Sequence, residues 1–386
     1  MTFAPRHHLT LVVIAAFCVG ILTSCASSEA IPTYQDATDT QYLHDDEGNL
    51  WDVADLAHQE MVKQNVLYDD PALQAYLKDV HDRLFPEFNG VFKLFVIRNS
   101  VANAFVMPNG YVYFNTGLLA RLDNEAQLAS ILAHEGSHFV ERHSLKQRRN
   151  IHSSALVSLA IGVGTGYTEL YQLGTIASLS GYSQFLENEA DSEGFARLAA
   201  AGYDIYEAVK PFQLLEAEAK ALDYPKQLFF RSHPKMHERV ESLSRLTAAH
   251  PGCLQPCDRN SQNKRFHRLA DTARLDAIDS LHAKGDYKSL IFLLDTQNKL
   301  ELFSAQARFY LADAFRLRGN DEDQQRMLDE YEATIQEAPD FAPTYRALGR
   351  LHIADDRERA VGYFKKYLVL APNANDRALI EGFINE

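Results

Sequence analysis

The stretch NEAQLASILAHEGSHFVERHSLKQ, at residues 124–147, contains the strongest secondary-structure signal in the chain. Its apolar residues, among them Leu128 and Ile131, recur at the three- and four-residue steps of one helical face, which predicts an amphipathic helix. Asn124 and Gln127 are placed like a capping box at its start. We therefore expect a continuous helix over residues 124–147 with a buried apolar stripe.

His134 and His138 lie four residues apart within this predicted helix. A four-residue step brings two imidazoles to one helical face, where both can bind one Zn²⁺. Glu135 then lies beside the metal, placed to take a proton from a water molecule whose acidity the metal raises. The alternative is an ordinary polar helix surface, but two histidines and a carboxylate in an apolar helix are costly without a ligand.

A third ligand is expected from the sequence ENEAD at residues 187–191. Glu187 and Asp191 are one helical turn apart, so one can bind the metal while the other accepts the free ring N–H of a ligand histidine. We predict Glu187 as the ligand and Asp191 as its supporting partner. Glu189 is rotated by roughly 200° and is the alternative ligand. His143 lies off the register that a third histidine ligand would need.

These motifs resemble the HtpX/CAAX-prenyl-protease-like zinc metallopeptidases of the gluzincin class, and within them the periplasmic BepA-like subgroup with a tetratricopeptide tail. The resemblance implies peptide-bond hydrolysis at Zn²⁺ held by His134, His138 and Glu187. Two departures are Gly136-Ser137, in place of an apolar-small pair, and Gln184, where relatives often carry Arg. The resemblance covers Asn103-Ala104-Phe105, Asn115 to Leu119, Asn124 to His138, Arg142-His143, Glu187 to Asp191, Ser232-His233-Pro234 and Arg239.

The same resemblance implies roles for residues outside the metal-binding motif. The segment Asn103-Ala104-Phe105 resembles an edge strand that offers backbone hydrogen bonds to an extended substrate, and a purely structural hairpin is the alternative. His233 has three open roles: a structural histidine, an oxyanion-stabilising catalytic residue, or a reversible fourth zinc ligand. Arg239 is expected to form an ion pair that stabilises the loop carrying His233.

The N-terminus has the features of an export signal. Arg6, His7 and His8 precede an uncharged apolar run from Leu9 to Leu22, which is long enough for a signal peptide and short for a spanning helix. The sequence Leu-Thr-Ser-Cys that ends at Cys25 resembles a bacterial lipobox. We expect cleavage before Cys25, lipidation of this cysteine and anchoring in the inner leaflet of the outer membrane. An ordinary signal peptide with a chance cysteine is the alternative.

Two cysteines remain after Cys18 in the signal and Cys25 are set aside. Cys253 and Cys257 are close in sequence, and in an oxidising periplasm they are expected to form a short-loop disulfide. A zinc knuckle is the alternative, but no second Cys or His pair stands at ligand spacing.

The regions around the central helix predict a small mixed domain. Two helices are expected at about 51–66 and 71–84, followed by a strand at 92–97 and a hairpin at 104–114. Residues 153–186 are almost uncharged and interrupted by glycines, which we interpret as a helical hairpin or lid. Membrane contact by this segment is the alternative.

Helices are expected throughout the C-terminal region. Residues 342–372 resemble a tetratricopeptide repeat, residues 311–339 a looser copy, and Gly285-Asp286-Tyr287 the turn of an earlier helix pair. A generic helical bundle gives a similar pattern. The predicted fold class is α+β, with a mainly helical gluzincin domain that contains a small sheet, followed by an all-α tetratricopeptide-like domain. The expected segments are a lipoprotein signal at 1–24, a tether at 25–50, the metallopeptidase domain at 51–250, a linker with the disulfide at 251–265, and the repeat domain at 266–386.

Composition limits the function classes. The chain has 386 residues, 46% of them hydrophobic, and a formal charge of −14, so a disordered tail is excluded and a nucleic-acid partner is disfavoured. We expect a periplasmic zinc endopeptidase that degrades unfolded or misfolded envelope proteins, with repeats that dock the outer-membrane assembly machinery. The alternative is a chaperone or scaffold with latent protease activity, and a small-molecule metalloenzyme is a more distant third.

Overall fold

The computed structural model of the protein describes residues 31–35, 45–152, 182–222, 233, 236–250, 259–297 and 299–385. The predicted signal with Cys25 and nearly all of the predicted lid at 153–186 lie outside these residues. Cys253 and Cys257 also lie outside them, so their pairing stays a prediction.

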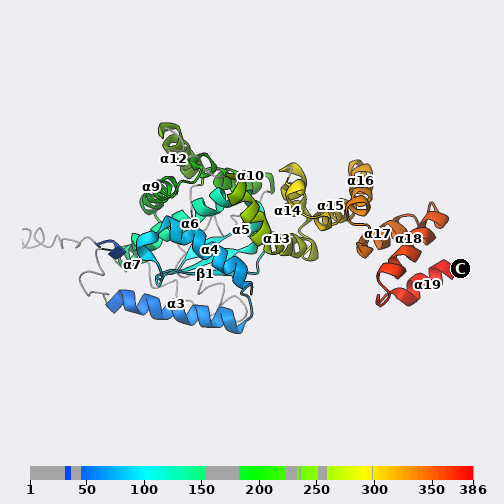
Figure 1. Ribbon diagram of the computed structural model, residues 1–386, viewed down its shortest axis with the longest axis horizontal. Helices are drawn as coiled ribbons and strands as arrows, with labels where there is room; N and C mark the ends of the chain where they lie inside the picture. The colour runs from blue at the N-terminus through cyan, green and yellow to red at the C-terminus, as the bar shows by residue number, and fades with distance from the viewer. Residues whose placement is uncertain are drawn as a thin grey trace, which may run out of the picture.

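The described residues form a mainly helical body at the N-terminal side and an arm of paired helices that extends from it (Figure 1). The body contains α3 (Asp45–Lys63), α4 (Pro71–Leu84), β1 (Lys93–Ile97), β2 (Ala104–Val106), β3 (Tyr111–Asn115), α5 (Thr116–Arg121), α6 (Glu125–Val140), α7 (His143–His152), α9 (Gln184–Ala200), α10 (Lys210–Leu222) and α12 (Met236–Ala249). The arm contains α13 (Arg259–Ala283), α14 (Tyr287–Ile291), α15 (Ala305–Arg318), α16 (Gln324–Glu337), α17 (Ala342–Leu351), α18 (Arg357–Leu370) and α19 (Arg377–Asn385).

The three strands form a small mixed sheet in the order β1-β3-β2. β1 is parallel to β3, and β2 pairs antiparallel with β3 as the predicted hairpin. Gly110 adopts a φ of 82°, which lets its N–H donate to the carbonyl of Met107 and close the turn. Because β3 lies in the centre, β2 is an edge strand that packs beside α6.

The central helix differs from its prediction in length and in burial. All 16 residues of α6 are buried, so the helix is enclosed on every side. It ends at Val140, seven residues before the predicted end, and α7 begins at His143. Arg142 has a φ of 54°, a left-handed conformation that breaks the helix. The Asn124 side chain accepts from the N–H of Gln127, as predicted.

Two glycines let other helices approach α6 closely. A Cβ at Gly194 of α9 would lie 3.0 Å from the backbone nitrogen of His134. A Cβ at Gly136 of α6 would lie 2.4 Å from the ring of Phe85, which follows α4. The unusual glycine inside the histidine pentad therefore has a packing reason.

The helix α3 begins inside the segment predicted as a tether, at Asp45 instead of about Trp51. Glu47 is buried and forms an ion pair with the guanidinium of Arg142. Tyr34 packs on Phe139, with ring centroids 4.6 Å apart. These contacts attach the N-terminal segment to the end of α6, so a helix and packed side chains occupy part of the segment that was predicted as a tether.

The helix α13, which has 25 residues, begins at Arg259 and so overlaps the second half of the predicted linker at residues 251–265. Its first half places Phe266, Ala270 and Ala273 in the core of the body. Its second half, which includes Ile278 and Leu281, packs in the first core of the arm. One helix therefore belongs to both hydrophobic cores.

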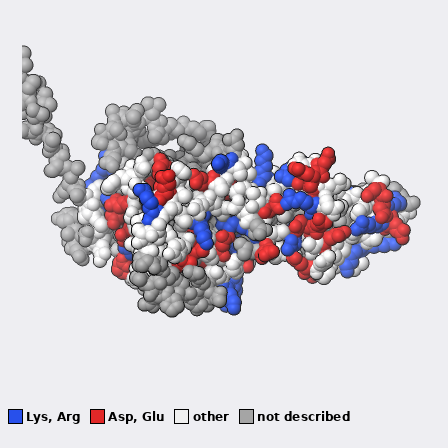
Figure 2. Space-filling view, turned by 90° about the horizontal axis from the view of Figure 1, so that it is seen from above, with Lys and Arg blue, Asp and Glu red and all other residues white. Residues whose placement is uncertain are grey.

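The arm is a series of paired helices, α13 with α14, α15 with α16, and α17 with α18, followed by α19. Gly349 of α17 packs against the Phe364 ring of α18, and a Cβ there would lie 2.6 Å from that ring. Basic and acidic side chains alternate along the visible face of the arm in Figure 2. Ion pairs within the arm join Arg308 to Glu330, Arg318 to Asp323 and Arg346 to Asp376. The expected all-α region is confirmed, whereas its assignment as tetratricopeptide repeats stays a prediction.

A buried lysine joins the arm to the body. The ammonium of Lys299 donates to the carbonyl of Arg121 and pairs with Asp123, just before α6. The guanidinium of Arg121 is itself buried and paired with Glu218 of α10. The first part of the arm is thereby fixed to the segment that leads into α6.

We expect Phe266→Ala to lower the free energy of unfolding by about 3–5 kcal/mol, because it opens a cavity in the core of the body. Thermal and urea unfolding of the full chain measure this effect. Arg268→Ala, at an exposed position on the same helix, is the matched control and should change stability by less than about 0.5 kcal/mol. Equal stability of both variants would show that α13 does not complete the body.

Candidate metal centre

Four side chains from three parts of the body meet in one buried cluster. His134 and His138 come from α6, Glu187 from the first turn of α9, and His233 from the segment before α12. One donor atom from each of the four lies within 4.8 Å of the others, and all four residues are buried. The sequence-predicted ligands are therefore brought together, although Glu187 and His233 are far from the histidine pair in sequence.

The two imidazoles of α6 turn the same ring atom toward the cluster. Their Nε2 atoms are 3.0 Å apart. The Nδ1 atom of His134 lies 2.9 Å from the carboxylate of Asp191, and that of His138 lies 2.7 Å from Nδ1 of His143. Because each Nδ1 has its own partner, the Nε2 lone pairs are left to converge, as in protein zinc sites. The donor set fits a divalent metal.

The carboxylates of α9 divide as their helical spacing predicts. The oxygens of Glu187 lie 3.6 Å from Nε2 of His134 and 3.7 Å from Nε2 of His138. Glu189 faces away from the cluster and lies 2.9 Å from Nε2 of His143. The structure therefore places Glu187 at the cluster and the alternative ligand, Glu189, outside it.

Arg239 of α12 connects the carboxylates behind the cluster. Its guanidinium donates to both oxygens of Asp191, at 2.7 and 3.0 Å, and lies 3.3 Å from Glu187. It also lies over the ring of Phe212 at 4.4 Å, so its charge is shielded from water. Arg239 thus bonds directly to the α9 carboxylates beside the metal cluster. The sequence predicts instead an ion pair that stabilises the loop carrying His233.

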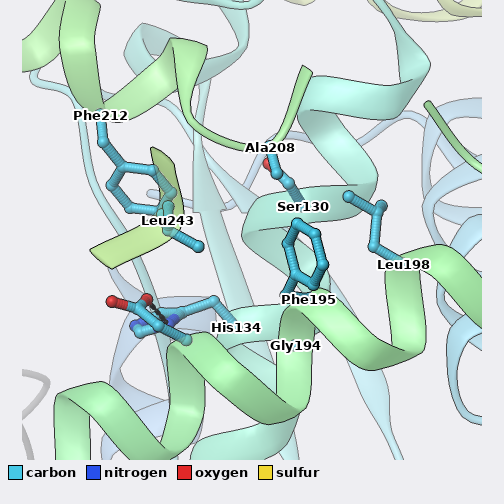
Figure 3. A pocket seen from close by; sticks show the side chains of 9 residues that line it. Ser130, His134, Gly194, Phe195, Leu198, Ala208, Phe212 and Leu243 are labelled. Carbon is cyan, nitrogen blue, oxygen red and sulfur yellow. Dashed lines mark ion pairs between the residues drawn. The ribbon is translucent and has the colours of Figure 1, made fainter. Parts of the chain in front are cut away.

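A pocket lies against the back of His134, between α6, α9, α10 and α12 (Figure 3). Phe195, Phe212 and Leu243 line it together with small residues of α6 and α9. The contact between Nδ1 of His134 and the carboxylate of Asp191 forms part of its wall. These apolar walls keep water from the Nδ1 side of His134, which strengthens its bond to Asp191.

His233 lies between the predicted base and the predicted third ligand. Its Nδ1 is 3.1 Å from Glu187 and 3.4 Å from Nε2 of His134. Its Nε2 is 3.3 Å from the carboxylate of Glu135. This buried position is compatible with the fourth-ligand role, with the oxyanion-stabilising role and with a structural role in the core, so the choice among them stays a prediction.

Burial sets the protonation of the cluster. It lowers the pKa of His134 and of His138 well below the usual value, and the nearby Arg239 acts in the same direction. Both rings are therefore neutral, which is the form that binds metal. Burial raises the pKa of Glu135, as is useful in a general base. For His233 burial acts to lower the pKa, but Glu187 and Glu135 outweigh it and raise the value to about 9.

The sequence did not reveal Tyr182 at the centre, nor the role there of His143, which was considered only as a metal ligand. His143 bonds to His138 only because the helix breaks, and no glycine or proline marks that break. Burial lowers its pKa to about 4, so this ring is neutral too. Tyr182 stacks on His138, with ring centroids 4.0 Å apart and planes 16° apart. Its position next to Ser183, the residue that caps α9, was the available signal.

The proposed substrate segment Asn103-Ala104-Phe105 lies at β2, and its side chains are buried in the body. The carbonyl of Asn103 accepts from the N–H of Asn115, and the N–H of Met107 donates to Tyr111. Because antiparallel pairing alternates, the backbone groups of Ala104 and Val106 face away from β3. Both residues are buried as a whole, main chain included, so contact with an extended chain would require these backbone groups to be uncovered.

Comparison with known proteins agrees with the metal cluster. The profile of peptidase family M48 matches residues 67–247, which include both histidines of α6, Glu187 and His233. Residues 67–247 belong to peptidase family M48. The matched region thus contains a buried cluster of histidine and glutamate side chains that could bind a metal ion, with Glu135 beside it.

Among its relatives is the beta-barrel assembly-enhancing protease of Escherichia coli O157:H7, which is 29% identical over 49% of this chain and 42% of that protein. A Vibrio cholerae protein provisionally given the same name is 28% identical over 62% of this chain and 52% of its own length. The mitochondrial metalloendopeptidase OMA1 of Schizosaccharomyces pombe is 30% identical over 39% of this chain and 45% of that protein. The chain spans about half the length of these curated relatives.

We expect Glu187→Ala to lower zinc affinity by more than about 100-fold, because it removes a metal ligand. Loss of a residue that only hydrogen-bonds to a ligand typically costs about 10–100-fold. Competition with a chromophoric chelator measures the affinity. Glu193→Ala, on the same helix and partly exposed beside Arg197, is the matched control and should bind zinc like the unmodified chain. Unchanged affinity in Glu187→Ala would remove Glu187 from the ligand set.

Proposed function

We propose that the protein is a zinc-dependent endopeptidase, in which His134, His138 and Glu187 hold the metal. The observation that carries this proposal is the convergence of two neutral imidazoles and one carboxylate, with a second buried carboxylate beside them. Such a nitrogen and oxygen donor set suits Zn²⁺. When bound, zinc supplies Lewis acidity that polarises a peptide carbonyl and makes water more acidic.

The residues of the chain supply the proton transfers and the orientation. Glu135 is buried next to both histidines, so its carboxylate is placed to accept a proton from the attacking water and to pass it to the leaving amine. Asp191 holds the ring of His134, and Arg239 holds Asp191 and Glu187 in place. This arrangement fixes the ligands before substrate arrives.

The proposed substrates are unfolded or misfolded proteins of the bacterial envelope, in particular outer-membrane proteins that fail to assemble. Two observations support this substrate class. The edge strand β2 lies beside α6, and the backbone groups of Ala104 and Val106 face away from β3, so an extended chain could pair there once these buried groups are uncovered. Several relatives are named beta-barrel assembly-enhancing proteases.

The arm is proposed to dock substrates or the outer-membrane assembly machinery. Stacked helix pairs offer an extended surface of the kind that repeat proteins use for partners. The second candidate function is a chaperone or scaffold with latent protease activity, which the length of the arm favours. The complete set of ligands with Glu135 beside it favours the peptidase, because a scaffold alone has no use for a buried general base.

The proposed location is the periplasmic face of the outer membrane, with a lipid on Cys25. This proposal rests on the signal-like N-terminus and the lipobox-like sequence before Cys25. Within the residues that the structure describes, none of the helices is long and apolar enough to cross a membrane. Mass spectrometry of the protein isolated from its native host identifies the N-terminal residue and any acyl chains.

We expect Glu135→Gln to retain zinc, because the ligands are unchanged, and to cleave casein at least about 10²-fold more slowly through loss of the general base. Zinc stoichiometry and casein hydrolysis on the same preparation measure both effects. Turnover like that of the unmodified chain would refute the role of Glu135 and favour the scaffold.

For His233 we propose a reversible fourth zinc ligand that holds the resting enzyme inactive. In this role the ring would bind in its neutral form and release the proton that Glu187 and Glu135 stabilise on it. A fourth protein ligand occupies the position that a catalytic zinc site keeps open. His233→Ala is then expected to raise basal casein cleavage at equal zinc occupancy. An oxyanion-stabilising role predicts a fall of about 10²-fold or more instead. Unchanged activity would contradict both roles.

A further inference from the structure

His143 reaches His138 although the two residues do not share a helical face. Five residues of continuous α-helix would rotate His143 by about 140° away from His138. The break between α6 and α7 turns the chain back, and the two Nδ1 atoms come to 2.7 Å. Both rings are fully enclosed, so this contact is not an exposed and exchangeable one.

The break is held by contacts from the N-terminal segment. Arg142 adopts a left-handed conformation that is uncommon for residues other than glycine. Its buried guanidinium pairs with Glu47 of α3 and donates to the carbonyl of Pro32 at 3.3 Å. These contacts fix the direction in which the chain leaves α6, and with it the position of the His143 ring.

The short contact between the two rings determines where their protons lie. Two ring nitrogens at 2.7 Å form a hydrogen bond only if one carries a proton and the other does not. His138 directs Nε2 toward the cluster, so its proton is on Nδ1, which donates to Nδ1 of His143. The proton of His143 is then on Nε2, which donates to Glu189 at 2.9 Å.

We propose that His143 is a positioning residue for the metal ligand His138, and that Glu189 acts through His143. This inference rests on the proposed metal centre and deepens it. His143 keeps the proton of His138 on Nδ1 and leaves Nε2 free for the metal, while Glu189 fixes the proton of His143 on its far side. Glu189 thus contributes to metal binding without being a ligand.

Each metal-binding imidazole of α6 therefore has its own support. His134 bonds directly to a buried carboxylate, Asp191, whereas His138 reaches the partly exposed carboxylate of Glu189 through a neutral ring. Tyr182 stacks on His138 and limits tilting of its plane, but stacking does not choose which nitrogen carries the proton. Among the residues that the structure describes, the bond to His143 makes that choice.

The test compares two substitutions of His143 in the full chain. His143→Leu removes the acceptor, and we expect zinc affinity in chelator competition to fall by about 10–100-fold. His143→Asn places an amide oxygen near the position of Nδ1, so it should retain most of the affinity. Zinc affinity in His143→Leu equal to that of the unmodified chain would overturn the proposal, as would equal losses in both variants.

A second readout separates positioning from general damage to the fold. The absorption bands of Co²⁺ bound in place of zinc report the ligand geometry, and we expect them to shift in His143→Leu and to be retained in His143→Asn. Thermal unfolding of the metal-free proteins compares their folds. Unshifted Co²⁺ bands in His143→Leu would contradict the positioning role.

Glu189 gives an independent test at a partly exposed position that tolerates change. We expect Glu189→Ala to weaken zinc binding by up to about tenfold, whereas Glu193→Ala leaves it unchanged. In the double variant with His143→Leu, loss of Glu189 should cause no further weakening, because Glu189 acts through His143. A further loss there, or no loss in Glu189→Ala alone, would refute the link. If His134→Ala bound zinc normally, the metal centre itself would fail, independently of His143.

Discussion

A helix that is buried along its whole length carries two imidazoles and a carboxylate, so every polar atom on it needs a partner away from water. Asp191 and Glu187 of α9 meet this need on one side, and His143 of α7 meets it on another. Arg239 of α12 then balances the charge of the α9 carboxylates. The placement of three helices around α6 follows from this one requirement, and the same bonds leave the Nε2 lone pairs free for a metal.

Close approach of the helices makes these bonds possible. Gly194 allows the backbone of α9 to lie against the backbone of α6 at His134, and Gly136 admits the Phe85 ring against the opposite face. A side chain at either position would separate elements whose functional atoms must stay within hydrogen-bond distance. The two glycines therefore serve the site through packing, although neither contributes a functional group.

The body and the arm are not independent in this fold. Phe266 near the start of α13 packs in the body, and Lys299 of the arm bonds to the segment that begins α6. A chain cut at residue 265 would lose part of the core around the metal helix, so the activity of such a fragment would not report on the arm alone. Substitutions on α15 to α19 leave these contacts intact and are better suited to separate docking from catalysis.

Local patterns in the sequence were sufficient for the elements that carry the ligands. The four-residue step of His134 and His138, the shared face of Glu187 and Asp191, and the hairpin before α5 all depend on periodicity within one element. The break at Arg142 and the true extent of α13 were not predictable in this way. Arg142 is held by Glu47, which lies 95 residues earlier, and Phe266 is buried by residues of the distant body. Contacts between segments far apart in sequence have no local signature, so only the tertiary structure could bring His143 and Glu189 to the metal centre.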